Sequence, residues 1–331
     1  MTILVTGGAG YIGSHMVHDL VDAGERVVVL DNLSTGFRFL IPSAVPFVVG
    51  STGDRQLVTK TIHQHGVTAI VHFAASLVVP ESVTDPLAYY SNNTMNTCTL
   101  LDLAVEAGVK HFIFSSTAAV YGNPQHVPVR EDAPTTPISP YGSSKLMSEL
   151  MLHDAGRAYG LRFVVLRYFN VAGADPKRRT GQSTPAATHL IKVACEAALG
   201  KRPKIDIFGT DYPTPDGTGI RDYIHVSDLV RAHSAALAYL RRGGDSTTFN
   251  CGYGRGVSVL EVIDSVKRAS RRDFPVAIRE RRVGDPTALV ADVARIRSTL
   301  DWRPQYEGLD TIVSHALAWE QLLAKRKTTT A

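Results

Sequence analysis

The chain has 331 residues, enough for one large domain or two modest ones with a full hydrophobic core. Hydrophobic residues make up 44% and charged residues 20%, an ordinary globular composition that excludes a small disulfide-stabilised scaffold and long disordered tails. Thirty-five Lys and Arg against 31 Asp and Glu leave a net charge of +4, too small an excess to favour nucleic acid as a partner. An anionic small substrate suits this charge better.

The cysteines and the N-terminal residues bear on cellular location. Cys98, Cys195 and Cys251 are far apart and form no C-x-x-C pair, so they indicate neither a zinc ribbon nor a redox motif. We expect buried apolar thiols in a reducing compartment. The first residues include no basic leader, and no apolar run approaches the roughly 20 residues that span a bilayer. These features predict a cytoplasmic protein without membrane contact.

Short β-branched runs alternate with longer segments of helical periodicity over the first 170 residues. This alternation predicts a parallel sheet covered by helices on both faces, which is a Rossmann-type, doubly wound α/β fold. The expected strands are Ile3–Thr6, Arg26–Leu30, Phe47–Val49, Ala69–Phe73, His111–Ser115 and Phe163–Tyr168.

The sequence beyond residue 170 is richer in Gly, Pro and charged residues, which predicts a smaller, loop-rich C-terminal lobe. Residues 1–170 would form the first domain and 171–331 mainly the second, with segments near 222–251 returning to the first. The later elements expected are helices at Asp228–Leu240, Val259–Ala269 and Leu309–Leu323, and a strand at Thr247–Cys251.

The first expected strand runs directly into Gly7-Gly8-Ala9-Gly10-Tyr11-Ile12-Gly13, which opens a helical segment ending near Gly24. Glycines let the backbone approach a pyrophosphate, and a helix N-terminus offers free N–H groups and partial positive charge. The second strand leads to Asp31, 18 residues after Gly13, close to the offset of about 20 for an acid that binds ribose. Because a carboxylate would repel a 2′-phosphate, the pattern predicts NAD rather than NADP. A turn serving only chain reversal would not need this joint spacing.

A second group of residues follows the fifth expected strand. Tyr141 comes 24 residues after Thr117, and Ser139 and Pro140 can begin a helix that carries Tyr141 and Lys145 on one face. A phenol is a poor base at neutral pH, but a neighbouring ammonium and an oxidised nicotinamide both favour phenolate. Tyr141 could then remove a hydroxyl proton while hydride leaves the same carbon, with Thr117 holding the same oxygen. Tyr-x-x-x-Lys alone is common on helix surfaces, so the prediction depends on this context.

Longer stretches carry a more specific pattern; they are Val5–His15, Asp31–Ser34, His72–Ala75, Tyr89–Asn93, Ser115–Gly122, Arg167–Asn170 and Arg221–Val226. With these stretches the chain resembles the extended short-chain dehydrogenase/reductase family and, within it, the UDP-glucose 4-epimerases, also called UDP-galactose 4-epimerases. The resemblance extends from residue 2 to about residue 320.

The resemblance implies an isomerase of galactose and wider carbohydrate metabolism. It would interconvert UDP-galactose and UDP-glucose through a transient 4-keto sugar, with hydride passed to and from tightly bound NAD. Tyr141 would be the acid and base, and Lys145 would hold the nicotinamide ribose and lower the pKa of Tyr141. Thr117 would stand at the position where the family has a Ser or Thr. The resemblance also implies a UDP-sugar ligand and a homodimer.

The motifs and the resemblance together predict two sets of contacts, with NAD in the first domain and the nucleotide sugar mainly in the second. The cofactor set is Gly7, Gly10, Tyr11, Ile12, Gly13, Asp31, Asn32, Ser51, Thr52, Phe73, Ala74, Ala75, Asn92, Ser115, Tyr141, Lys145 and Tyr168. The substrate set is Thr117, Tyr141, Asn170, Leu190, Phe208, Arg221, Arg282 and Asp285. Two departures from the family pattern leave questions open: Ser51-Thr52 for the adenine contact, and Leu289 for the acceptance of N-acetylated sugars.

Other functions are compatible with parts of the sequence. A nucleotide-sugar 4,6-dehydratase shares the fold and the Tyr/Lys pair but needs a further acid and base, and the Asp-Glu of dehydratases is Ala118-Ala119 here. An epimerase of another UDP-sugar, an N-acetylhexosamine or a pentose, stays open. A non-enzymatic NAD-sensing or scaffold protein would not require both Tyr141 and Lys145.

Metal and nucleic-acid chemistry have little support in the sequence. No third ligand accompanies the pair His15 and His18 or the pair His63 and His65, so no metal is expected. The basic runs Arg241-Arg242 and Arg279–Arg282 are too short for a nucleic-acid surface.

Overall fold

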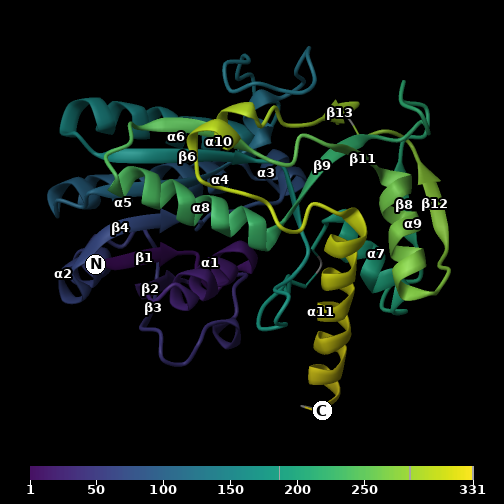
Figure 1. The fold of residues 1–331 in the computed structure, drawn as a ribbon, viewed down its shortest axis with the longest axis horizontal. Helices are drawn as coiled ribbons and strands as arrows, with labels where there is room; N and C mark the ends of the chain where they lie inside the picture. The colour runs from purple at the N-terminus through teal and green to yellow at the C-terminus, as the bar shows by residue number, and fades with distance from the viewer. Residues whose placement is uncertain (186, 283–284, 330–331) are drawn as a thin grey trace.

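The computed structural model describes residues 1–185, 187–282 and 285–329 (Figure 1). Its largest element is a seven-stranded sheet in the order β10-β6-β5-β4-β1-β2-β3. All the strand pairs in it are parallel. The strands are β1 (Thr2–Thr6), β2 (Arg26–Asp31), β3 (Phe47–Val49), β4 (Val67–His72), β5 (His111–Thr117), β6 (Arg162–Tyr168) and β10 (Thr247–Cys251).

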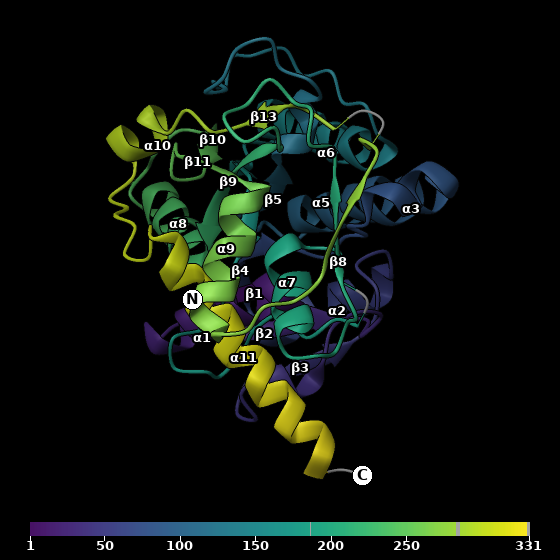
Figure 2. The same ribbon diagram turned by 90° about the vertical axis from the view of Figure 1, so that its right-hand side faces the viewer.

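Helices cover both faces of this sheet (Figures 1 and 2). One face carries α1 (Tyr11–Asp22) and α8 (Val226–Arg241), and the other carries α2 (Arg55–His65), α5 (Asn96–Glu106) and α6 (Pro140–Tyr159). Ile3 and Val5 of β1 belong to the apolar cluster on the first face, whereas Leu4 belongs to the cluster on the second. A strand buried on both faces is apolar throughout, and the predicted doubly wound α/β fold is confirmed.

Short helical segments connect the main elements near the ends of the strands. They are η1 (Arg38–Leu40), α3 (Val79–Thr84), α4 (Pro86–Tyr89), η2 (Tyr90–Met95) and η3 (Ala118–Tyr121).

The chain beyond β6 builds two smaller sheets and a group of helices. One sheet contains β7 (Asn170–Ala172), β9 (Ile220–His225), β11 (Gly256–Ser258) and β13 (Ala288–Leu289), and the other pairs β8 (Ile205–Phe208) with β12 (Val276–Arg279). The helices α7 (Leu190–Ala198), α9 (Val259–Ser270) and α11 (Leu309–Thr329) pack against one another, as Figure 2 shows, and α10 (Ala294–Thr299) lies beside β10.

The expected strands and the three expected later helices are present, with shifts only at their ends. The small sheets were not predicted, because their strands are short and their partners lie far along the chain. In one case, Asn170 of β7 is in register with Tyr223 of β9. Such pairing leaves no local periodicity in the sequence.

All three cysteines are free, and two of them, Cys195 and Cys251, are buried as expected. The expectation is wrong for Cys98, which is exposed on α5. The neighbouring Leu100 and Leu101 turn inward to the core, so Cys98 falls on the outer side of the helix.

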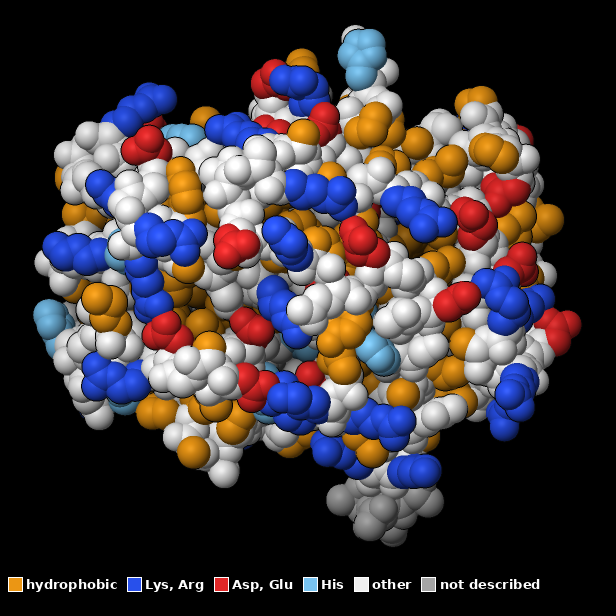
Figure 3. Space-filling view, in the orientation of Figure 1, with side chains coloured by type: hydrophobic (Ala, Val, Ile, Leu, Met, Phe, Trp, Pro, Cys, Tyr) orange, Lys and Arg blue, Asp and Glu red, His pale blue; other side chains and the backbone are white. Residues whose placement is uncertain are grey.

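The face seen in Figure 3 carries Lys and Arg side chains interspersed with Asp and Glu, without a field of one sign. In the described ranges, no helix is both long and apolar enough to cross a bilayer.

Candidate active site

The glycine turn joins β1 to α1 beside the end of β4. Gly7 has a φ of +67°, and a Cβ built on it would lie 2.5 Å from the backbone nitrogen of Ala74. A Cβ on Gly13 would lie 2.1 Å from the carbonyl oxygen of Gly7. No side chain caps the N-terminus of α1 at Gly10, so the N–H groups of its first turn can receive an anion. The turn therefore fits a pyrophosphate.

Asp31 lies at the end of β2 with its carboxylate buried beside this turn. Its Oδ2 accepts a hydrogen bond from the Ala9 N–H at 2.8 Å, and its Oδ1 accepts one from the Leu33 N–H at 2.7 Å. Burial raises the pKa of Asp31, while the two backbone donors lower it. Each oxygen retains a lone pair, so the carboxylate can accept two ribose hydroxyls.

The residues predicted near the adenine surround the same strand ends. Asn32 is exposed and its Oδ1 accepts from the Ser34 N–H, whereas Thr52 is buried. The Ser51 hydroxyl oxygen accepts from the Gly53 N–H at 3.1 Å. A role for Ser51 toward adenine thus stays a prediction.

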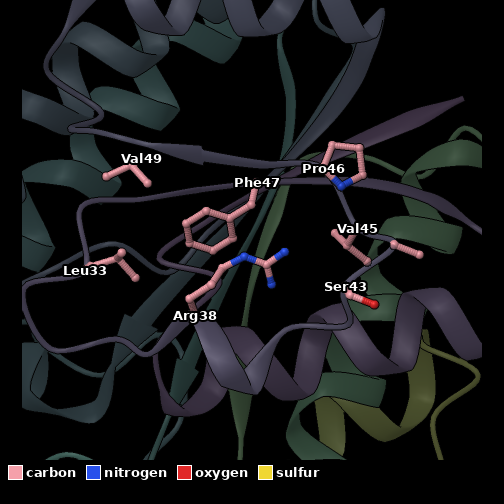
Figure 4. Close-up of a pocket in the computed structure, with 8 residues that line it drawn as sticks. Leu33, Arg38, Ser43, Val45, Pro46, Phe47 and Val49 are labelled. Carbon is pink, nitrogen blue, oxygen red and sulfur yellow. The ribbon is translucent and has the colours of Figure 1, made fainter.

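An open pocket of 560 Å³ adjoins this region and is lined by β3 and by the segment that connects β2 to β3. Figure 4 shows Arg38 reaching across it toward Phe47, and the guanidinium carbon lies 4.8 Å from the ring centroid. Val49 and Leu33 complete the wall near Asp31. None of the described lining residues belongs to the predicted cofactor set, so the pocket lies beside that set.

The helix α6 begins as predicted, with Pro140 in its first turn and the Ser139 hydroxyl accepting from the Gly142 N–H at 3.2 Å. This start places Tyr141 and Lys145 one turn apart, both buried, at the ends of the central strands. The Lys145 Nζ donates to the carbonyl of Ser115 at 3.0 Å and lies 4.9 Å from the ring centroid of Phe114 on the same strand. The sheet thereby fixes the ammonium group beside the predicted base.

Burial shifts the pKa values of these two groups in opposite directions. It raises the pKa of Tyr141, which a hydrogen bond with Thr117 partly lowers. It lowers the pKa of Lys145 to about 8, although the nearby Glu149 carboxylate raises it. In the protein alone the phenol is therefore held protonated. The predicted lowering of the Tyr141 pKa needs a further positive charge, which an oxidised nicotinamide would supply.

Other predicted cofactor residues converge on the same edge of the sheet. Phe73 follows β4 and its ring centroid lies 4.9 Å from that of His233 on α8. The Ser115 hydroxyl on β5 donates to the Tyr168 hydroxyl on β6 at 2.7 Å, and the Asn92 amide donates to Ser76 at 3.0 Å. In doubly wound sheets, ligands bind at this carboxyl edge of the strands. The glycine turn, the acceptor at Asp31 and the ammonium of Lys145 together fit NAD.

A pocket between β7, α7 and α11 brings predicted cofactor and substrate residues together. Tyr11, Asn170 and Leu190 line it together with Trp319 and Glu320 of α11. The Tyr11 hydroxyl donates to the carbonyl of Gly173 at 2.7 Å. The start of α1 is thus hydrogen-bonded to the segment after β7, close to the predicted substrate residue Asn170.

The remaining predicted substrate residues form two pairs in the part of the chain that builds the smaller sheets. Arg221 on β9 forms an ion pair with Asp285. The guanidinium carbon of Arg282 lies 3.9 Å from the ring centroid of Phe208, which ends β8. In each pair a second side chain orients the guanidinium group of an arginine. Guanidinium groups can bind a diphosphate, and an aromatic ring can pack against a nucleobase.

Sequence reasoning missed three residues behind the predicted base, namely Ser116, Glu149 and Arg167. They form a buried hydrogen-bonded group between α6 and the strands β5 and β6. The available signal was the spacing of Glu149, four residues after Lys145 and eight after Tyr141, which puts all three on one helix face. Elsewhere, no group of three or more His, Cys, Asp or Glu among the described residues is arranged to hold a metal ion.

Residues 3–252 match the model of the NAD dependent epimerase/dehydratase family, and the chain belongs to that family. Within it, the chain is 60% identical over 321 residues, 97% of its length and 92% of the relative's, to a UDP-glucose 4-epimerase of Azospirillum brasilense. The crystal structure of UDP-glucose 4-epimerase from Brucella ovis in complex with NAD is similar with a TM-score of 0.93, 45% identity and coverage of 96% and 97% of the two chains. The UDP-Glc/GlcNAc 4-epimerase of Campylobacter jejuni is similar with a TM-score of 0.86, 49% identity and coverage of 97% and 99%. The resemblance predicted from the sequence is confirmed.

Proposed function

We propose that this protein is an NAD-dependent isomerase that interconverts UDP-galactose and UDP-glucose through a transient 4-keto sugar. The main observation that supports this function is that the glycine turn, Asp31 and the Tyr141–Lys145 pair lie at one edge of the sheet. The similarity to UDP-glucose 4-epimerases over nearly the whole chain supports the same reaction and substrate class.

In this proposal Tyr141 takes the proton of the sugar 4′-hydroxyl and later returns it. The glycine turn and Asp31 would hold NAD, which would supply a reversible hydride acceptor for C4 and so keep the overall reaction redox-neutral. Thr117 holds the reacting oxygen, because it lies at the end of β5 and hydrogen-bonds with Tyr141. Lys145 supplies positive charge one helical turn from Tyr141, and because both side chains are buried, water screens this charge little.

The environment of Thr117 favours epimerisation over dehydration. A 4,6-dehydratase needs a further acid and base next to the reacting sugar, but Ala118 and Ala119 follow Thr117 in η3. Neither side chain can exchange a proton. We therefore assign no elimination step to this site.

The two parts of the chain are proposed to divide the ligands between them. Residues 1–170, with the segments near 222–251, would bind NAD, and residues 171–331 would bind mainly the nucleotide sugar. The first set contains the glycine turn and Asp31, and the second contains the Phe208–Arg282 and Arg221–Asp285 pairs. The free cysteines of the protein suit a reducing compartment. We therefore infer that it is a cytoplasmic enzyme of galactose metabolism.

Incubation of the purified protein with UDP-galactose and no added cofactor is expected to yield UDP-glucose. Proton NMR of the anomeric signals measures this conversion directly, and a parallel sample with UDP-N-acetylgalactosamine tests substrate breadth. Conversion only after NAD is added would support the reaction and contradict tight retention of the cofactor. Absence of conversion with and without NAD would refute the proposed function.

A homodimer is also proposed, through an apolar surface on η2 and α6, which pack against each other. Met95, Met147 and Leu150 are exposed on these neighbouring elements, with Leu150 56% accessible. Exposed apolar side chains on adjacent helices are typical of a protein–protein contact, and a second copy of the chain presents the same surface.

Leu150→Glu is expected to convert the parent dimer to a monomer, because a dimer would bury the new charge. Sedimentation equilibrium would give twice the chain mass of 35.8 kDa for the parent and that mass itself for the variant. The matched control is Ile278→Glu, since Ile278 is similarly exposed on β12 in the other lobe. A parent protein that sediments as a monomer would refute the dimer.

A further inference from the structure

The helix α6 carries a third ionisable side chain on the face of Tyr141 and Lys145. Glu149 follows Lys145 by four residues, one helical turn deeper along the sheet. It is only 1% exposed. A carboxylate buried to this degree is costly unless it is paired and fully hydrogen-bonded.

The partners of Glu149 come from both central strands. Its Oε2 accepts from the Arg167 Nη2 at 2.6 Å, and the Arg167 Nε lies 3.1 Å from each carboxylate oxygen. Its Oε1 also accepts a hydrogen bond from the Ser116 hydroxyl. One carboxylate thereby holds α6 to β5 and β6 at the same time.

The register of the sheet places these bonds directly behind the predicted site. Ser116 and Arg167 are neighbours across β5 and β6, and their side chains meet Glu149 on the α6 face. Ser116 lies between Ser115, whose carbonyl holds the Lys145 ammonium, and Thr117, which hydrogen-bonds with Tyr141. A shift of α6 relative to the Ser116 segment would therefore move Lys145 and Tyr141 together.

Arg167 is itself held on its other side. Its Nη1 donates to the Tyr121 hydroxyl at 3.0 Å and to the Glu131 carbonyl at 3.3 Å. The Tyr121 hydroxyl in turn donates to Asn250 on β10 at 2.6 Å. With its donors directed to fixed partners, Arg167 anchors the Glu149 carboxylate in one position.

We propose that Glu149 is a positioning residue for the reaction, which through Arg167 and Ser116 fixes α6 and places a negative charge one helical turn from Lys145. It touches neither substrate nor cofactor in this proposal and acts through Lys145. The kinetic part of the proposal rests on the proposed function, whereas the effect on Lys145 does not.

The charges around Lys145 support this assignment. Among the groups that affect the pKa of Lys145, burial lowers it to about 8 and Glu149 raises it. The pKa of His72 on β4 is lowered to about 3, first by burial and then by the charge of Lys145, so His72 is neutral. The elements packed against α6 carry further titratable side chains, which are Arg162, Arg167 and Tyr168 on β6, His111 on β5, Tyr121 on η3, Glu81 on α3, Tyr89 on α4, Tyr90 on η2, and Cys98, Asp102 and Glu106 on α5. Arg167 is paired with Glu149, Tyr89 donates to Glu81, and the two α5 acids pair with Arg55 at the surface.

The direct test is the titration of Lys145 by NMR in protein labelled with ¹³Cε-lysine, with the Lys145 signal assigned from Lys145→Arg. Glu149→Gln is expected to lower the midpoint of the Lys145 titration by about half a pH unit or more, because the ammonium loses its nearby carboxylate. Glu149→Asp keeps the charge and is expected to keep the parent midpoint. An unchanged midpoint in Glu149→Gln would overturn the proposal whether or not the protein epimerises UDP-sugars.

The kinetic test compares the pH dependence of kcat. Because deprotonation of Lys145 removes the charge beside Tyr141, the fall of kcat at high pH is expected to begin at lower pH in Glu149→Gln, with KM for UDP-galactose within about twofold of the parent. Asp228→Asn is the matched control, since Asp228 is fully buried and bonded to Tyr253 on a part of the molecule away from α6. A uniform loss at every pH, as a merely structural role would give, would contradict the assignment.

Removal of the carboxylate leaves Arg167 unpaired and could prevent folding. The double variant Glu149→Gln/Arg167→Met leaves no unpaired charge. The Lys145 titration and the pH dependence of kcat can both be measured on it. It is expected to fold and to show the lowered Lys145 midpoint. A parent-like midpoint and pH profile in this variant would refute the role of Glu149.

Discussion

Tyr141→Phe is expected to lower kcat by about 10²–10⁴-fold, the contribution typical of a positioned acid–base group. The substitution removes only the phenolic oxygen, which is the atom proposed to take the proton. Thr117 cannot replace it, because an aliphatic hydroxyl is a far weaker acid than a phenol. The loss would therefore fall on turnover, with little change in KM.

The fold and the bound cofactor are expected to survive this change. The ring of Tyr141 is buried and lies edge-on to Tyr89, with 6.5 Å between the ring centroids, and a phenylalanine ring fills the same space. Near-UV circular dichroism would test the packing, and the absorbance of released NAD would test retention. Tyr159→Phe, near the exposed C-terminal end of the same helix, is the control and is expected to epimerise at the parent rate. Parent-like turnover in Tyr141→Phe would show that another group is the base.

Gly13→Ala is expected to weaken NAD binding by at least about 100-fold. The new methyl carbon would lie 2.1 Å from the Gly7 carbonyl oxygen and 2.8 Å from the Gly8 Cα, both backbone atoms that no side-chain rotation can relieve. The turn must open, and the N–H groups proposed to bind the pyrophosphate then no longer point toward the same position. Isothermal calorimetry on protein stripped of cofactor would measure the change in Kd.

The matched control is Gly308→Ala, where the nearest atom would be the Thr311 hydroxyl at 3.4 Å, an ordinary contact. This variant is expected to bind NAD as the parent does and to keep its thermal unfolding midpoint within a few degrees. If Gly13→Ala bound NAD with the parent Kd, the glycine turn would not be the pyrophosphate site.

The local part of the site could be predicted from sequence because each element of it is a short-range pattern. The glycine turn and Asp31 lie within one strand–helix–strand unit, and Tyr141 and Lys145 lie one turn apart on one helix. The structure places all four at one edge of the sheet. Their ligand contacts are still predictions, whereas the fold and the family are confirmed.

The partners of these residues could not be predicted in the same way. The Arg221–Asp285 ion pair joins residues 64 positions apart, and Glu149 lies 33 positions from Ser116 and 18 from Arg167. The periodicity of a single sequence indicates which face of a helix or strand is apolar. It does not indicate which side chain from a distant part of the chain will contact that face.

The sequence by itself therefore determined the strands of the first half, the nucleotide turn and the candidate base, because hydrophobic period, glycine geometry and helix capping act over a few residues. Only the tertiary structure decided the exposure of Cys98, the strands of the two smaller sheets and the hydrogen bonds of Glu149 with Ser116 and Arg167. The physical reason is that burial and ion pairing depend on which surfaces the chain brings together. For Glu149, those surfaces are the α6 face and the adjacent ends of β5 and β6.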